Sequence, residues 1–422
     1  MTTAKLSCKN PSGEVFVIPS KSSAHRNLIC AALSDEKTEI ICPASSQDIT
    51  ATVRCLNALG AEIEENNSVY YVTPIRKKQK AHLDCGESGS TLRFLTPVAA
   101  SLGGEITLSG HGRIPSRPMS ELVDCLSDNG AKISYGGTLP ITTHGGLRSG
   151  RFEIQGSVSS QFISGLIFAL PLLSGNSVIE ITGKPESLPY IEMTLDTVKK
   201  FGINAEFEGN EIGICGNQKY TSPEKLTVEG DWSNAAFWLC LGAFSDKGIT
   251  VSGLKKDSVQ GDRAIVGLLR EFGANVTEGD GFVKVSRAPL KGIRIDASEI
   301  PDLVPVLTVV AAVAQGETII YNASRLRIKE SDRIESTVAM LRALGACAEA
   351  TADGIRVVGV KSLSGGIVDA YNDHRIVMSA AVAAAVSDAA VEIRGAEAVR
   401  KSYGDFFEKY QTLGANAEIT EV

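Results

Sequence analysis

Several segments combine Lys or Arg with Ser, Thr, Gly or Asn, residue types that bind anionic ligands through charge, hydroxyl groups and backbone N–H groups. They are residues 19–26 (PSKSSAHR), 86–93 (GESGSTLR), 112–118 (GRIPSRP), 156–162 (GSVSSQF), and, in the second half, 300–302 (IPD), 325–333 (RLRIKESDR), 368–375 (VDAYNDHR) and Lys401. Each alone is also consistent with a capped surface helix or a solvated loop. Because together they come from five of the six repeated units described below, we expect them to converge on one cleft.

The first segment predicts a helix N-terminus. Ser20 or Ser22 is suited to cap a helix that continues into the apolar run 28–33. A helix N-terminus carrying serine hydroxyls and Lys21 would bind an anion, although an ordinary capped helix is the simpler interpretation of this segment alone.

Two further segments predict loops in which the backbone approaches a ligand. In 86–93, small residues leave the backbone N–H groups accessible and Arg93 lies one turn into the following helix, but the Gly-Lys-Ser/Thr ending of a Walker A loop is missing. In 112–118, Arg113 and Arg117 lie in a proline-rich loop, and Pro118 is suited to the first position of a helix. The hydroxyls and amide of 156–162 could bind phosphate or sugar-like hydroxyls, or belong to a solvated loop.

The second half supplies candidate acids and bases. Asp302 precedes a strongly apolar run, which predicts a raised pKa suited to proton transfer. The cluster 325–333 is either a solvated helix face or an anion site, because Lys329 and Arg333 would be like charges four residues apart on a helix. His374 is either a general acid or part of a capped surface pair with Arg375.

These segments are positioned by an internal repeat. An apolar segment, a glycine and an alternating run recur six times, with glycine separations of 70, 72, 71, 72 and 69 residues. The glycines are Gly60, Gly130, Gly202, Gly273, Gly345 and Gly414. Each copy predicts a helix that ends at a left-handed glycine and is followed by a strand. Six units of about 70 residues fill the chain, which predicts two domains of three α/β units each. The apolar stretches 303–314 and 376–386 are expected to be buried helices.

Composition excludes several classes of protein. The chain has 422 residues, is 43% hydrophobic and carries a net charge of −7, which argues against disorder and against nucleic acid as the main partner. Nine cysteines without a C-x-x-C pair predict a reduced, cytoplasmic protein with buried or partly buried thiols, no disulfide framework and no structural zinc. No secretory signal and no apolar stretch of about 20 residues is found, so a membrane protein is not expected. The lack of G-x-G-x-x-G after a strand disfavours a dehydrogenase.

The motifs together resemble the EPSP synthase family of enolpyruvyl transferases over essentially the full chain. The shared strings, in family order, are PSKSSAHR, SGSTLR, SRPM, GSVSSQF, PDLVPVL, LRIKESDR, YNDHR and KSYGDFF. The resemblance implies a two-domain inside-out α/β barrel with three βαβαββ units per domain. One domain would comprise 1–19 and 230–422, and the inserted one 20–229. It further implies transfer of the enolpyruvyl group of phosphoenolpyruvate to the 5-hydroxyl of shikimate 3-phosphate, without a cofactor, by a monomer.

The resemblance also implies residue roles. Phosphoenolpyruvate would be held by Lys21, Gly89, Arg117, Gln161, Arg333, Arg375 and Lys401. Shikimate 3-phosphate would be held by Lys21, Ser22, Arg26, Ser159, Ser160, Gln161, Ser187, Tyr190, Asp302 and Lys329. Asp302 and Glu330 would be the acid/base pair, with Lys21 assisting phosphate departure. Glu87 and Arg325 stand where the family often has Asn, so neither is assigned a role.

Two alternatives remain open at this point. UDP-N-acetylglucosamine enolpyruvyl transferase has the same fold and donor but typically carries a Cys in the loop that is here 110–117, which has none. A non-catalytic anion-binding protein on the same scaffold is disfavoured because Lys21, Asp302 and Glu330 are all present.

Overall fold

The computed structural model describes residues 2–76, 80–184 and 186–421. The chain divides into two compact units. Unit 1 comprises Met1–Ile18 and Glu229–Val422, and unit 2 comprises Pro19–Val228. Each unit has its own hydrophobic core.

Every sheet in the described chain follows one plan. Six four-stranded sheets each begin with two parallel strands and continue with two antiparallel ones. In unit 2 the sheets are β14(Lys225–Thr227)-β3(Thr38–Ile41)-β5(Val69–Thr73)-β4(Glu62–Asn66), β6(Lys80–Asp84)-β7(Glu105–Ser109)-β9(Ile141–Thr143)-β8(Ile133–Tyr135), and β10(Arg151–Gln155)-β11(Ser177–Thr182)-β13(Glu211–Ile214)-β12(Ala205–Glu208). In unit 1 they are β2(Gly13–Phe16)-β15(Ile249–Ser252)-β17(Phe282–Ser286)-β16(Asn275–Gly279), β18(Arg294–Asp296)-β19(Glu317–Tyr321)-β21(Ile355–Val358)-β20(Cys347–Ala350), and β22(Gly366–Asp369)-β23(Val391–Arg394)-β1(Thr2–Ser7)-β24(Asn416–Glu421).

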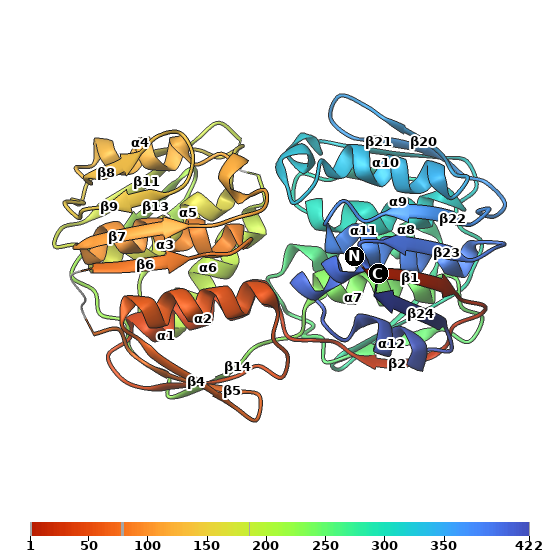
Figure 1. Cartoon of the computed structure of the whole chain (residues 1–422), viewed down its shortest axis with the longest axis horizontal. Helices are drawn as coiled ribbons and strands as arrows, with labels where there is room; N and C mark the ends of the chain where they lie inside the picture. The colour runs from red at the N-terminus through yellow and green to blue at the C-terminus, as the bar shows by residue number, and fades with distance from the viewer. Residues whose placement is uncertain (1, 77–79, 185, 422) are drawn as a thin grey trace. The chain divides into compact units, whose positions relative to one another are not determined.

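Strands from distant parts of the chain complete a sheet in each unit. In unit 1, β1 pairs with β24 over six residues, so the red and blue ends of the chain lie side by side (Figure 1). In unit 2, β14 from the end of the unit pairs with β3 from its beginning. These long-range pairings close each unit upon itself.

Two kinds of helix alternate along the chain. The odd-numbered ones are α1(Lys21–Leu33), α3(Gly89–Leu102), α5(Ser160–Ala169), α7(Trp232–Gly242), α9(Val304–Ala312) and α11(His374–Ala383), and the even-numbered ones are α2(Gln47–Leu59), α4(Ser120–Asp128), α6(Leu188–Lys200), α8(Ile265–Phe272), α10(Arg333–Ala343) and α12(Phe406–Thr412). Every residue of α9 and α11 is buried, as the apolar stretches 303–314 and 376–386 predicted. The even-numbered helices α2 and α8 are apolar on one face only, as expected for helices at a unit's surface.

The predicted repeat is confirmed at all six glycines. Each has a positive φ, between 78° and 108°, and lies between an even-numbered helix and the strand that follows it. At Gly60 a Cβ atom would lie 2.3 Å from the carbonyl oxygen of Arg76, so both the conformation and the space require glycine. The repeated glycine therefore turns the chain from the surface helix into the sheet.

Three further expectations can be compared with the described residues. All nine cysteines are free; seven are buried, but Cys215 and Cys347 are exposed, so the expectation of buried or partly buried thiols is wrong for these two. No group of His, Cys, Asp and Glu in the described part of the chain could hold a metal ion. Over those same residues, no helix has both the length and the apolar character needed to cross a membrane.

Candidate active site

In unit 2, three of the predicted anion-binding segments each begin a helix. Ser20, Ser88 and Ser159 cap α1, α3 and α5, and each side-chain oxygen accepts a hydrogen bond from a backbone N–H in the first turn. Of the two serines suggested for the first cap, Ser20 is the one used. Pro118 is not at the first position of a helix, because α4 begins at Ser120 with Met119 as its cap.

Polar contacts link these helices close to their N-termini. Arg93 Nη1 of α3 donates to Gln161 Oε1 of α5 at 2.8 Å, and Gln161 Nε2 donates to Ser90 Oγ at 2.8 Å. Arg26 Nε of α1 donates to Thr194 Oγ1 of α6, which in turn donates to Ser164 Oγ of α5, both at 2.8 Å. The side chains of Gln161 and Arg26 are therefore held in place before any ligand binds.

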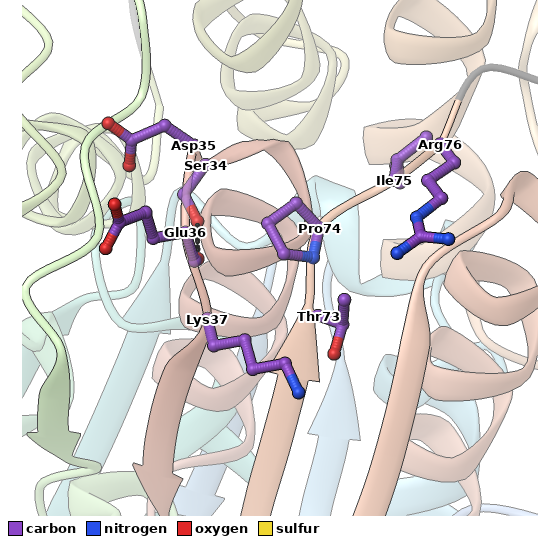
Figure 2. A pocket seen from close by; sticks show the side chains of 8 residues that line it. All are labelled: Ser34, Asp35, Glu36, Lys37, Thr73, Pro74, Ile75 and Arg76. Atoms are coloured by element: carbon purple, nitrogen blue, oxygen red, sulfur yellow. Dashed lines mark hydrogen bonds between the residues drawn. The ribbon is translucent and has the colours of Figure 1, made fainter.

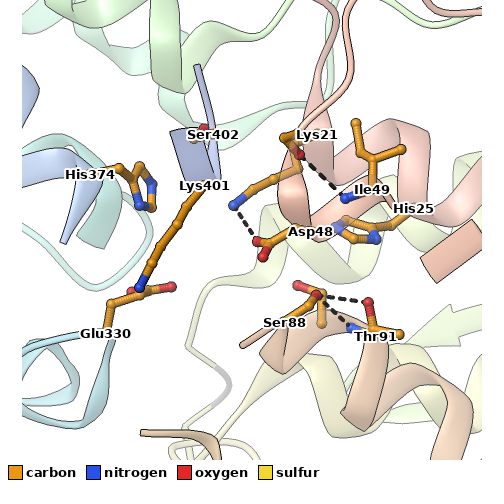
Figure 3. A network of polar contacts seen from close by, with 12 residues as sticks. Lys21, His25, Asp48, Ile49, Ser88, Thr91, Glu330, His374, Lys401 and Ser402 are labelled. Atoms are coloured by element: carbon orange, nitrogen blue, oxygen red, sulfur yellow. Dashed lines mark hydrogen bonds and ion pairs between the residues drawn. The ribbon is translucent and has the colours of Figure 1, made fainter. Parts of the chain in front are cut away.

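Lys21, the first residue of α1, is paired with a carboxylate. Its Nζ atom lies 2.8 Å from Asp48 Oδ2, and both side chains retain some exposure, 17% and 16% respectively (Figure 3). Asp48 lies in the first turn of α2, where its negative charge also interacts favourably with the helix dipole. This pair orients the ammonium group that the sequence singled out.

Gly89 and Arg117 lie against each other. A Cβ atom added to Gly89 would lie 2.6 Å from Arg117 Nη1, so the absent side chain gives the guanidinium its space. Arg117 follows the short 3-10 helix Ile114–Ser116, and its Nε is buried without a hydrogen-bond partner among the described residues. A buried donor of this kind is costly unless a ligand or water satisfies it.

Most of the residues assigned to shikimate 3-phosphate lie on α1, at the start of α5 or at the start of α6, whereas Asp302 and Lys329 belong to unit 1. Arg26 is 2% exposed and also donates to the backbone oxygens of Ser22 and Tyr190, each at 2.8 Å. Burial lowers the pKa of Arg26 to about 10. Ser187 precedes α6 in the left-handed conformation with φ of 55°, an unusual backbone for serine that is frequent at functional sites. Ser160 is the buried first residue of α5.

In unit 1, Arg333 is held by three carboxylates. Its Nη1 lies 2.8 Å from Asp302 Oδ1, its Nη2 lies 2.6 Å from Glu330 Oε2, and its Nε lies 2.8 Å from Asp373 Oδ2. Arg375 Nη2 lies 2.8 Å from the other Asp302 oxygen. The predicted acid/base pair and the two predicted carboxylate-binding arginines thus form one cluster.

The prediction of a raised pKa for Asp302 is wrong. Burial favours a higher pKa, but the positive charges of Arg375, Lys329 and Arg333 outweigh it and hold the pKa of Asp302 far below its ordinary value. The apolar run that follows Asp302 forms α9, whereas the carboxylate pairs with Arg333 from later in the same repeat and with Arg375 from the next repeat. Asp302 is therefore ionised in the absence of ligand.

The charge cluster 325–333 is not a continuous helix face. Ser324–Ile328 forms a 3-10 helix, and α10 begins only at Arg333, capped by Asp332. Burial, with the charges of Arg325 and Arg333, lowers the pKa of Lys329 to about 8, although Asp302 opposes the shift. Lys329 and Arg333 are thus not neighbours on one helix.

Asp373 lies in the segment 368–375, but the sequence patterns did not predict it as a site residue. It is fully buried, caps α11 and accepts hydrogen bonds from Arg333 and from Ser331 Oγ at 3.0 Å. An Asp directly before an apolar helix is a detectable cap signal, but its partner on another repeat is not detectable in this way. Nearby, Lys401 Nζ donates to the backbone oxygen of Asn372 at 2.9 Å, and His374 is buried rather than on the surface.

Asp262 is a second buried acid that the sequence interpretation missed. It is 3% exposed and accepts a hydrogen bond from Ser233 Oγ at the start of α7. Burial and the charge of Asp302 raise the pKa of Asp262 to about 7, although Arg375 opposes the shift. Unit 1 therefore holds two buried acids whose pKa values are shifted in opposite directions: that of Asp262 is raised and that of Asp302 is lowered.

Unit 2 also contains a cavity. It has a volume of 660 Å³ and is lined by Ser34, Asp35, Glu36, Lys37, Thr73, Pro74, Ile75 and Arg76. Figure 2 shows its acidic side chains on one side and Arg76 on the other. None of the predicted site residues lines it.

Comparison with known proteins identifies the same family throughout. A family model described as EPSP synthase (3-phosphoshikimate 1-carboxyvinyltransferase) matches residues 7–410. The 3-phosphoshikimate 1-carboxyvinyltransferase of Clostridium kluyveri is 43% identical over 412 residues and 96% of each chain. That of Clostridium novyi is 41% identical over 429 residues and 98% of each chain.

Solved structures agree. EPSP synthase from Acinetobacter baumannii superposes with a TM-score of 0.85 over 100% of both chains at 25% identity. The enolpyruvyl transferase NikO from Streptomyces tendae gives 0.81 at 18% identity, over 100% of this chain and 99% of that one, and supports the fold alone. These likenesses confirm the predicted α/β fold of six repeats, the inside-out barrel. The chain therefore belongs to the EPSP synthase (3-phosphoshikimate 1-carboxyvinyltransferase) family.

Proposed function

We infer that this chain transfers the enolpyruvyl group of phosphoenolpyruvate to the 5-hydroxyl of shikimate 3-phosphate, a step of aromatic amino-acid biosynthesis by the shikimate pathway. The hydroxyl oxygen attacks C2 of phosphoenolpyruvate while C3 gains a proton, which gives a tetrahedral intermediate. Loss of phosphate from C2 and of a proton from C3 then restores the double bond. The cluster of Asp302, Glu330, Arg333 and Arg375 carries this inference, because it combines proton-transfer groups with carboxylate-binding guanidiniums.

We propose that the assigned residues act in these roles. Glu330 protonates C3, Asp302 accepts the hydroxyl proton and Lys21 assists departure of phosphate. Phosphoenolpyruvate binds Lys21, Gly89, Arg117, Gln161, Arg333, Arg375 and Lys401, and shikimate 3-phosphate binds Lys21, Ser22, Arg26, Ser159, Ser160, Gln161, Ser187, Tyr190, Asp302 and Lys329. Clustered cations lower the cost of bringing two anions together.

Asp302 has a low pKa in the ligand-free protein, so its basicity must increase before it can accept a proton. Arg333 and Arg375 stabilise the ionised carboxylate and make it a weak proton acceptor. We propose that the carboxylate of phosphoenolpyruvate takes over contacts from both guanidiniums. Asp302 would then be less stabilised as an anion, its pKa would rise, and its basicity would increase only once substrate is bound.

Phosphate release tests this function. The chain should release phosphate from phosphoenolpyruvate when shikimate 3-phosphate is present, and not with either substrate alone. Replacing the acceptor by UDP-N-acetylglucosamine should abolish release. Release with that nucleotide sugar, and none with shikimate 3-phosphate, would contradict the assignment, and no release with either acceptor would contradict catalysis altogether.

The space at Gly89 leads to a prediction about inhibition. We expect glyphosate to inhibit at submillimolar concentrations, and Gly89→Ala to raise both the KM for phosphoenolpyruvate and the inhibitory concentration at least tenfold. The new methyl group would displace Arg117, from which a Cβ is only 2.6 Å away. The control is Gly267→Ala, where a Cβ meets no atom within 4 Å. Wild-type activity that is unaffected at millimolar glyphosate would contradict the expectation.

We also propose that the protein is a cytoplasmic monomer. Its nine cysteines are unpaired, as is usual in a reducing compartment. All the assigned residues belong to one chain.

A further inference from the structure

Four buried side chains of unit 2 form a continuous hydrogen-bonded chain across three helices. His25 Nδ1 of α1 lies 2.6 Å from Thr52 Oγ1 of α2, which lies 2.7 Å from Thr91 Oγ1 of α3. Thr91 Oγ1 lies 2.7 Å from Ser88 Oγ, the cap of the same helix. None of the four is more than 1% exposed. This series of hydrogen bonds thus ends at Ser88, next to Gly89 and far from His25 in the sequence.

The direction of this chain follows from counting hydrogens. A hydroxyl has one hydrogen to donate, and Thr91 donates its hydrogen to Ser88. Thr52 must therefore donate to Thr91, since Thr91 has no second hydrogen to offer. Thr52 is then left only as an acceptor toward His25, so His25 must carry its hydrogen on Nδ1.

The surroundings of the imidazole agree with this neutral Nδ1–H form. His25 Nε2 is buried without a partner among the described residues, so a hydrogen on that nitrogen would be left unsatisfied. Burial lowers the pKa of His25 to about 3; Lys21 and Arg26 add to the shift, and Asp48 opposes it. The ring is therefore uncharged throughout the neutral pH range.

At the other end, Ser88 keeps a hydrogen. Its oxygen accepts from the hydroxyl of Thr91 and, at 3.3 Å, from the backbone N–H of Thr91 (Figure 3). Its own hydroxyl hydrogen has no acceptor in the described part of the chain. With the other histidine tautomer, every hydroxyl would reverse, and Ser88 would donate its hydrogen back to Thr91.

We propose that His25 is a positioning residue for enolpyruvyl transfer. Its Nδ1–H sets the direction of the hydrogen bonds through Thr52 and Thr91. Ser88 thereby retains a hydroxyl hydrogen that it can donate to an anionic oxygen of phosphoenolpyruvate at the start of α3. The inference rests on the proposed function through the assigned contact of that substrate with Gly89. His25 touches no substrate and acts only through Thr52 and Thr91. Cooperative polarisation along the chain strengthens the final donor.

The tautomer is tested directly by nitrogen-15 NMR of the full chain labelled at histidine. The signal of His25 is assigned by its loss in His25→Asn. We expect a protonated Nδ1 and a bare Nε2, unchanged between pH 5.5 and 8. A hydrogen on Nε2, or titration of the ring in this range, would overturn the inference whatever the activity of the chain.

Kinetics of a matched pair at Thr52 test the consequence. Thr52→Val keeps the shape but removes the hydroxyl, and it should raise the KM for phosphoenolpyruvate about tenfold, with kcat and the KM for shikimate 3-phosphate within about twofold of wild type. Thr52→Ser restores the hydroxyl and should restore the KM. His25→Asn, whose amide can donate to Thr52, should behave like Thr52→Ser, whereas His25→Leu should behave like Thr52→Val.

The outcomes separate this inference from the proposed function. An inactive wild-type chain would overturn both. Suppose that wild type is active but Thr52→Val either has wild-type kinetics or is impaired in kcat and in the KM values for both substrates. Only the role of the hydrogen bonds from His25 to Ser88 would then be overturned. Because thermal unfolding of each variant is measured in parallel, a misfolded His25→Leu is recognised, and the Thr52 pair still decides.

Discussion

Asp302→Asn is expected to lower kcat about 10³-fold, the loss typical of removing a group that transfers a proton in the transition state. Asn keeps the shape and an acceptor oxygen between Arg333 and Arg375, each of which lies 2.8 Å from the native carboxylate. It cannot take a proton, however, so binding of shikimate 3-phosphate should persist while chemistry fails. Glu330→Gln should show a loss of similar size, because an amide cannot protonate C3.

Rapid-quench kinetics of the two variants locate the defect. Both should accumulate the tetrahedral intermediate far more slowly than wild type under saturating substrates. Asp405→Asn, at a half-exposed carboxylate of the same unit whose ion pair with Lys409 is long at 3.9 Å, serves as the control and should leave the rate unchanged. Formation of the intermediate at the wild-type rate in both variants would contradict the assigned roles.

Asp373→Asn is expected to lower the free energy of unfolding by about 3 kcal/mol, the largest stability effect expected. Asp373 is fully buried and neutralises Arg333, which is itself 1% exposed. Asn would preserve the hydrogen bond to the start of α11 but not the charge. Asp302 and Glu330 would still pair with Arg333, which keeps the expected loss at the lower end for a broken buried ion pair.

Denaturant unfolding of Asp373→Asn and of the control Asp405→Asn measures this effect. Burial favours a higher pKa for Asp373, but Arg333 outweighs it and holds the pKa below its ordinary value of 3.8. The stabilisation by the carboxylate is therefore complete above that value and is lost as the pH falls below it. The gap between wild type and Asp373→Asn should be full at pH 7 and shrink below pH 4. Equal stability at pH 7 would contradict the prediction.

The repeated architecture could be read from the sequence because each copy carries a local signal. A left-handed glycine between a helix and a strand depends on backbone geometry at one residue, and six copies at constant spacing exclude coincidence. The caps Ser20, Ser88 and Ser159 are local in the same sense. Pro118 shows the limit, since a proline is tolerated before the cap as well as after it.

The charges in the site could not be read in this way, because they depend on residues far apart in the chain. The sequence places Asp302 beside an apolar run, which predicts a raised pKa, yet that pKa is lowered by Arg333 and Arg375, 31 and 73 residues away. The pairing of Lys21 with Asp48, 27 residues away, could not be predicted from sequence for the same reason. Sequence patterns can indicate which side chains do chemistry, but only the fold determines their partners and protonation.

Deuterium incorporation tests the central claim most directly. If the chain adds a proton to C3 of phosphoenolpyruvate and later removes one, then reaction with shikimate 3-phosphate in deuterated water should give an enolpyruvyl product with deuterium in its methylene group, seen by proton NMR. Phosphoenolpyruvate incubated without shikimate 3-phosphate should stay unlabelled. A product formed with no deuterium at C3, or no product from these two substrates, would contradict transfer by addition and elimination in this protein.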